Sequence, residues 1–136
     1  MHFHPIQGKT LDIIGAILRT QEVASVDHQQ GAIHLVVEEL VTNVVKYAYP
    51  DGTNDYLDVE LMRDESGLTL RFRDAGVPFN PLKRESPDTS LPVEQREIGG
   101  LGIFLVIQKV DDISYDYTDG ENVLTVFWHL ISCPSS

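Results

Sequence analysis

Three polar side chains are spaced so that they line one side of a single predicted helix. Glu39, Asn43 and Lys46 stand at i, i+4 and i+7, which puts a carboxylate, an amide and an ammonium in one row. The opposite face is apolar at helical spacing and consists of Ile33, Val36, Val37, Leu40, Val41, Val44 and Ala48. Such a row could form the wall of a ligand site, but an ordinary solvated face carries the same residue types. The helix alone leaves both interpretations open.

Two motifs further along the chain favour the ligand site. Asp74-Ala75-Gly76 follows a predicted strand, and Gly99-Gly100-Leu101-Gly102 opens a predicted helix. Each motif is weak alone, because Asp-x-Gly is usually a turn and Gly-x-Gly is usually a bend in a loop. The ordered set of three motifs, with the intervening elements in the right order, is much more specific.

The period of the apolar residues predicts the elements that must position these motifs. Helical spacing predicts a helix capped by Thr10, and a main helix that begins at a capping box of Asp27 and Gln30 and ends near Ala48. Alternation predicts strands at 57–62, 68–73, 113–117 and 123–131, and a short apolar helix is expected at 103–110. We therefore expect an α+β two-layer sandwich, with helices on one face of a mixed, mostly antiparallel sheet.

Composition limits the class of protein. A chain of 136 residues and 15.2 kDa fits a single domain spanning 1–136 with one core. The formal net charge of −11 argues against direct binding to nucleic acid or to an anionic membrane surface. Cys133 is the one cysteine, so no intramolecular disulfide is possible, and no apolar run approaches the roughly 20 residues of a membrane span. We expect a soluble, cytoplasmic protein.

The three motifs resemble the nucleotide-binding boxes of the gyrase, chaperone, histidine-kinase and mismatch-repair (GHKL, Bergerat-fold) ATPases. Within that superfamily, Glu39-Leu40-Val41-Thr42-Asn43, Asp74-Ala75-Gly76-Val77-Pro78-Phe79-Asn80-Pro81 and Ile98-Gly99-Gly100-Leu101-Gly102-Ile103-Phe104-Leu105-Val106 are similar to the anti-sigma-factor serine/threonine kinases. The resemblance covers about residues 30–130. It implies a Bergerat-type ATPase fold that binds ATP and Mg²⁺.

The resemblance also implies roles for residues on the main helix. Asn43 would ligate Mg²⁺ through its amide oxygen, which suits a hard cation already bound to phosphates. Glu39, one turn earlier, would be the general base that accepts the proton of an attacking hydroxyl or water. Lys46 and Tyr47 resemble nucleotide contacts of histidine kinases, although a surface lysine and a packed tyrosine explain them equally well.

The remaining boxes would hold the base and the phosphates. Asp74 would accept the adenine amino proton, Gly76 would let the backbone pass close to the base, and Thr125 would support that contact through water. Gly99, Gly100, Leu101 and Gly102 would bring backbone and a helix N-terminus to the phosphates.

The long segment 77–99 carries four of the seven prolines, and the resemblance implies that it is a lid over the nucleotide. Its cations Lys83, Arg84 and Arg96 could each reach the γ-phosphate. The sequence does not choose among them, because Ile98 stands where these kinases often have an arginine.

The leading interpretation is a serine/threonine kinase that phosphorylates a small anti-anti-sigma-type (STAS-like) partner and restrains a sigma factor, with a homodimer as in that family. The alternative is a nucleotide-dependent binding module without physiological kinase activity. Glu39 favours the enzyme, because ATP binding alone does not require it. A histidine-kinase ATPase domain is the weakest of the three, since no phosphoacceptor helix precedes residue 27.

Overall fold

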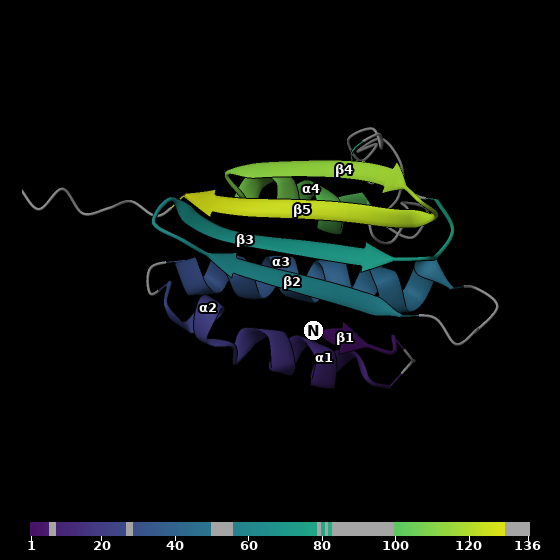
Figure 1. Ribbon diagram of the computed structural model, residues 1–136, viewed down its shortest axis with the longest axis horizontal. Helices are drawn as coiled ribbons and strands as arrows, with labels where there is room; N and C mark the ends of the chain where they lie inside the picture. Colours follow the sequence, from purple (N-terminus) through teal and green to yellow (C-terminus); the bar gives the residue numbers. More distant parts are fainter. Residues whose placement is uncertain are drawn as a thin grey trace, which may run out of the picture.

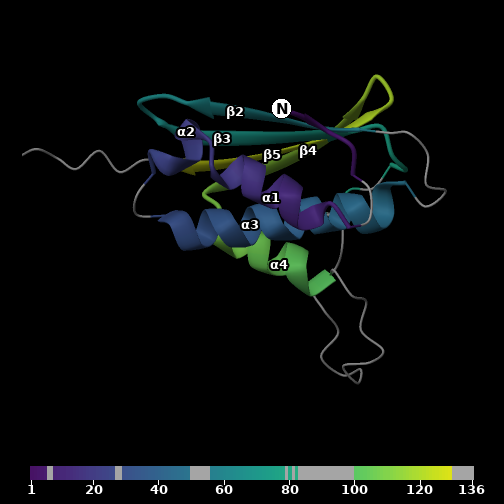
Figure 2. The same ribbon diagram turned by 90° about the horizontal axis from the view of Figure 1, so that it is seen from below.

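The computed structural model describes residues 1–5, 8–26, 29–49, 56–78, 80, 82 and 100–129. Within these ranges, strands form one layer and helices form a second layer beneath it (Figure 1 and Figure 2). The elements in chain order are β1 (His2–Phe3), α1 (Thr10–Leu18), α2 (Gln21–Ala24), α3 (Gln30–Asn43), the π-helical turn η2 (Val44–Ala48), β2 (Leu57–Arg63), β3 (Gly67–Asp74), α4 (Gly100–Lys109), β4 (Asp112–Thr118) and β5 (Glu121–His129).

The sheet is five-stranded in the order β1-β2-β3-β5-β4. The predicted α+β two-layer arrangement with a mostly antiparallel sheet is confirmed, and each of these neighbouring pairs is antiparallel, so the described strands include no parallel pair. β3 and β4 run in the same direction, yet they do not pair because β5 lies between them. The register places Asp74 of β3 opposite Asn122 of β5, far apart in the chain.

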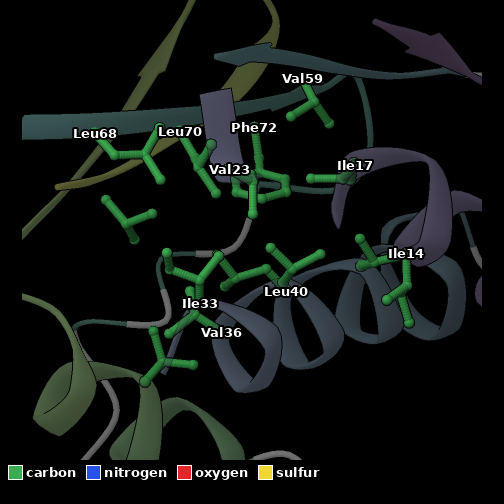
Figure 3. Close-up of a cluster of buried hydrophobic side chains, with 14 of the residues drawn as sticks. Ile14, Ile17, Val23, Ile33, Val36, Leu40, Val59, Leu68, Leu70 and Phe72 are labelled. Atoms are coloured by element: carbon green, nitrogen blue, oxygen red, sulfur yellow. The ribbon is translucent and has the colours of Figure 1, made fainter. Parts of the chain in front are cut away.

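The helices cover one face of this sheet, as the edge-on view shows (Figure 2). α3 lies between α1 and α4 and contacts both. Strand alternation turns Leu68, Leu70 and Phe72 toward the helices, where they are buried against residues such as Ile33 and Leu40 of α3 (Figure 3). This packed core holds the end of α3 near the end of β3 and the start of β5.

The helix ends differ from the sequence prediction. Thr10 is the first residue of α1, and Lys9 holds the cap position. α3 begins at Gln30 with Gln29 as its cap, and neither helix has a side-chain cap hydrogen bond. The Gln30 amide donates instead to the carbonyls of Val23 (2.7 Å) and Val26 (2.6 Å), which ties α3 to the preceding turn. Asp27 lies outside the described residues.

The main helix reaches Ala48 as predicted, but its last five residues form a π-helical turn. Such turns are rare in proteins, and those that occur are often found at functional sites. Tyr49, directly after η2, donates from its hydroxyl to the carbonyl of Tyr56 (2.6 Å) and accepts from the amide of Ala75 (2.8 Å). The wide turn is therefore held against the segment that leaves β3. In the described part of the chain, the helices are too short or too polar to cross a lipid bilayer.

Candidate functional site

A pocket lies where α3 and η2 meet the end of β3 and the start of β5. These ends of β3 and β5 lie at the right-hand side of the sheet in Figure 1. Its volume is about 140 Å³. The lining is Leu40, Asn43, Val44, Ala48, Phe72, Asp74, Val77, Pro78, Ile103, Tyr115, Asn122 and Leu124. A mostly apolar wall with a few convergent polar groups is typical of a small-molecule site. The structure thus brings together Asn43 and Asp74, which the sequence analysis had singled out separately.

Asp74 is the acidic residue of this pocket and is only 7 % exposed. Its Oδ1 accepts hydrogen bonds from the Gly76 amide (3.0 Å) and from Asn122 Nδ2 (3.0 Å). Burial raises the pKa of the Asp74 carboxyl above its ordinary value, and the two hydrogen bonds offset part of that rise. The fold therefore keeps a poorly solvated acceptor at the end of an apolar cavity.

Asn122 is a site residue that the sequence analysis missed. It is 7 % exposed, and its Nδ2 donates to Asp74 and to the carbonyls of Val77 (3.0 Å) and Gly76 (3.4 Å). The Tyr115 hydroxyl donates to Asn122 Oδ1 from β4. A signal existed in the alternation of β5, because Asn122 shares parity with the buried Val126 and Trp128.

The structure does not support the predicted role of Thr125, because Thr125 does not line the pocket. It differs in parity from Asn122 and Leu124, so its side chain lies on the opposite face of the sheet. There its hydroxyl accepts a hydrogen bond from Arg71 Nε (3.3 Å). The polar partner of Asp74 on β5 is Asn122.

The backbone at Gly76 passes very close to Ala48, the last residue of η2. A Cβ at this position would lie 2.3 Å from the Ala48 carbonyl oxygen and 2.7 Å from the Ala48 Cβ. The next amide, that of Val77, donates to the same Ala48 oxygen (3.0 Å). Glycine therefore allows the strand exit to pack directly against η2, which forms one wall of the pocket.

The predicted residues of the main helix separate into two groups. Asn43 is half-buried and lines the pocket, and Glu39 is half-buried one turn earlier outside the lining. Lys46 is exposed on η2, and a π-turn advances fewer degrees per residue, so Lys46 does not continue the predicted row. Tyr47 belongs to the same turn, but its side chain lies outside the described part of the structure.

The glycine-rich box lies at the start of α4. Gly100, Leu101 and Gly102 form its first turn, and Ile103 of the next turn lines the pocket. Gly99, Lys83, Arg84 and Arg96 lie outside the described residues, as does most of the segment 77–99. The lid therefore stays a prediction from the sequence.

The donor set bears on which metal the site could hold. Within the described residues, no three His, Cys, Asp or Glu side chains gather closely enough to form a metal site. Asn43 offers one neutral amide oxygen at the pocket. An amide oxygen is a hard ligand of the kind that Mg²⁺ accepts, and substrate phosphates and waters supply much of the coordination of Mg²⁺ in nucleotide sites.

Several known proteins are similar in sequence to this chain. The "Serine-protein kinase RsbW" of Listeria monocytogenes is 31% identical over 96 residues, which cover 68% of this chain and 61% of that protein. The protein of the same name from Bacillus thuringiensis is 34% identical over 94 residues (66% of this chain, 58% of that protein). The "Serine/threonine-protein kinase BtrW" of Bordetella bronchiseptica is 28% identical over 102 residues (75% and 70%). The chain thus spans about three fifths of the RsbW proteins that it matches.

The sequence profile of the histidine kinase-like ATPase domain matches residues 8–128, nearly the whole described fold. An ATPase domain of this kind implies ATP binding, in agreement with the pocket that joins Asn43, Asp74 and the start of α4. The chain belongs to the histidine kinase-like ATPase domain family.

Proposed function

We propose that this chain, as a single domain, is an ATP-dependent serine/threonine kinase that phosphorylates a small anti-anti-sigma-type (STAS-like) protein. It also acts in the cytoplasm as an anti-sigma factor that restrains a sigma factor when that partner is absent, and it works as a homodimer. The buried carboxylate of Asp74 at the end of an apolar pocket carries the nucleotide assignment. The names of the RsbW and BtrW relatives support the kinase assignment.

Adenine occupies the apolar part of the pocket, between residues such as Leu40, Ile103 and Leu124. Its amino group donates to Asp74, because both hydrogen bonds that the described residues make to this carboxylate end on Oδ1 and leave Oδ2 for a ligand. Guanine would place a carbonyl oxygen against the same carboxylate. Two facing acceptors repel each other, so the pocket selects ATP over GTP.

The phosphates extend from the base toward Asn43 and α4. Asn43 would hold a Mg²⁺ ion through its amide oxygen, and the ion would neutralise part of the charge on the phosphates. The backbone N–H groups in the first turn of α4 face the phosphates. The phosphates can approach them closely because Gly100 and Gly102 lack side chains. Lys46 makes no ion pair with the described acidic residues, so its ammonium is available to a phosphate.

Transfer begins when a serine or threonine hydroxyl oxygen of the partner attacks the γ-phosphorus. A new P–O bond forms to the partner, the bond between the γ-phosphorus and the β,γ-bridging oxygen breaks, and ADP leaves with that electron pair. Glu39 accepts the hydroxyl proton. Proton transfer of this kind contributes roughly 10²–10⁴-fold, and the low end suits phosphoryl transfer because positioning dominates that reaction.

A nucleotide-dependent binding module is the second candidate, and one residue separates it from the kinase. Both functions need Asn43 and Asp74, but only the kinase needs the Glu39 carboxylate. Glu38 provides the matched control, because it is the neighbouring carboxylate, is exposed, and pairs with His34 at 3.8 Å.

The test is single-turnover transfer from γ-labelled ATP to a candidate STAS-like protein from the same genome, with ATP affinity measured in parallel. We expect Glu39→Gln to bind ATP normally and to transfer about 10²-fold more slowly. Asn43→Ala should lose Mg²⁺-dependent ATP binding and transfer together, and Glu38→Gln should behave as wild type. Transfer by Glu39→Gln at the wild-type rate would favour the binding module.

A further inference from the structure

We propose that Asn122 determines the base specificity of the pocket by fixing which oxygen of Asp74 faces the base, and that Tyr115 orients Asn122 for this task. The inference rests on the proposed function, because it concerns adenine recognition in the same pocket. It assigns positioning roles to two residues, one on each of the strands β4 and β5.

The hydrogen bonds of Asn122 fix the orientation of its amide. Carboxylate and carbonyl oxygens can only accept, so Nδ2 must face Asp74 Oδ1 and the Val77 carbonyl, both at 3.0 Å. The opposite end, Oδ1, accepts from the Tyr115 hydroxyl. A flipped amide would set Oδ1 against two acceptors, the Asp74 carboxylate and the Val77 carbonyl. Both N–H groups of Asn122 are therefore used within the protein.

This arrangement leaves one oxygen of the carboxylate for a ligand. Asn122 and the Gly76 amide both donate to Oδ1, so the carboxyl plane of Asp74 is held by two bonds on the same atom. Among the described residues, Oδ2 has no comparable donor, and it is the oxygen left to accept from a base. Asn122 thus acts on the base through Asp74 and not by direct contact.

Asn122 also favours the ionised form of Asp74. Burial raises the pKa of this carboxyl, while the donors Asn122 and Gly76 lower it. The charge of Glu121, at the start of β5, raises it slightly, and Glu121 itself accepts from the Tyr56 hydroxyl. Among the described residues that line the pocket, Tyr115 is the other titratable group, and those of α3, η2 and α4 are uncharged.

Loss of Asn122 therefore has a consequence that depends on pH. Without its donor, the pKa of Asp74 rises further, and the carboxyl becomes protonated at a higher pH than in wild type. A protonated carboxyl is a hydrogen-bond donor. It can donate to the carbonyl of guanine, so the preference for ATP over GTP should shrink as the pH falls.

The test is calorimetric measurement of Mg·ATP and Mg·GTP affinity across the whole pH range in which wild type and variant stay folded. In wild type the ratio of ATP affinity to GTP affinity should begin to fall only at a lower pH than in Asn122→Leu. In Asn122→Leu, the ratio should fall toward low pH by about tenfold for each unit by which the pKa of Asp74 has risen. In Tyr115→Phe the ratio should fall in the same direction but by less. If Asn122→Leu does not fold, Tyr115→Phe takes its place in the test.

Thr125→Val is the matched control, because Thr125 lies on the same strand but on the other face, bonded to Arg71. It should keep the wild-type ratio at every pH. If folded Asn122→Leu binds both nucleotides more weakly by the same factor at every pH, Asn122 only joins β5 to the strand exit. The inference then fails while the proposed function stands. Wild type that binds neither nucleotide overturns the proposed function and this inference together.

Discussion

Replacement of Gly76 by alanine tests the contact that forms the wall of the pocket. The added Cβ would lie 2.3 Å from the oxygen, 2.7 Å from the Cβ and 2.8 Å from the carbonyl carbon of Ala48. Backbone atoms account for two of these contacts, so no flexible side chain can move aside. Either η2 or the strand exit at 74–77 must shift, and the hydrogen bond from the Val77 amide to the Ala48 oxygen (3.0 Å) must stretch.

The expected cost follows from these two effects. Overpacking of this kind costs about 1–3 kcal/mol, and a weakened hydrogen bond adds about 1 kcal/mol. The free energy of unfolding should therefore fall by about 2–4 kcal/mol, or about 4 °C in Tm for each kcal/mol in a chain of this size. Asp74 is two residues away, so ATP affinity should fall as well.

Urea denaturation without nucleotide measures the first quantity, and Gly31→Ala is the control. Gly31 lies in α3, and a Cβ added there would have open space within 4 Å beyond its own helix, so alanine should stabilise the protein by up to about 1 kcal/mol. If Gly76→Ala unfolds within about 0.5 kcal/mol of wild type, as surface substitutions do, the close approach of the strand exit to η2 is refuted.

Two further predictions concern pH and metal. Because the pKa of Asp74 is raised in the folded state, its contribution to stability is present at low pH and is lost as the pH rises through that pKa. Asp74→Asn should therefore be more stable than wild type at neutral pH, with the advantage disappearing in acid, as measured by urea unfolding across pH; a constant difference would contradict this. Chelation of divalent cations should weaken ATP binding but leave the Tm of the nucleotide-free protein unchanged, because the described residues contain no metal cluster; a lower Tm with chelator alone would indicate a structural metal.

The fold was predictable because its apolar periods are regular. The alternation of Leu68, Leu70 and Phe72 and the helical spacing of Ile33, Val36 and Leu40 each predict one buried face, and the structure buries both. Local sequence did not predict the π-turn after Asn43, because Val44 and Ala48 continue an ordinary helical spacing. The close packing of Gly76 on Ala48 helps to explain why the chain adopts this turn, and that contact is non-local.

The site was only partly predictable for the same reason. Asn43 and Asp74 stand in recognisable motifs, and the fold brings them to one pocket. Asn122 follows Asp119-Gly120 in what reads as a turn. Its parity on β5 predicts a buried position, but its pairing with Asp74 is a non-local contact that local sequence does not predict. Thr125 came from the resemblance, as the match to a threonine on the last strand, although the alternation of β5 already placed it on the opposite face from Val126 and Trp128.

The claim that the pocket binds adenine through Asp74 is tested most directly by the affinities of Mg·ATP and Mg·GTP for wild type and Asp74→Asn. The substituted amide can keep an oxygen for the Gly76 and Asn122 donors and sets an N–H₂ group in the place of Oδ2. Asp116→Asn, at an exposed position of β4, is the control. Wild type and the control should bind ATP at least about tenfold more tightly than GTP, a difference of about 1.4 kcal/mol, and Asp74→Asn should bind GTP at least as tightly as ATP. An unchanged preference for ATP in Asp74→Asn would show that Asp74 does not read the base.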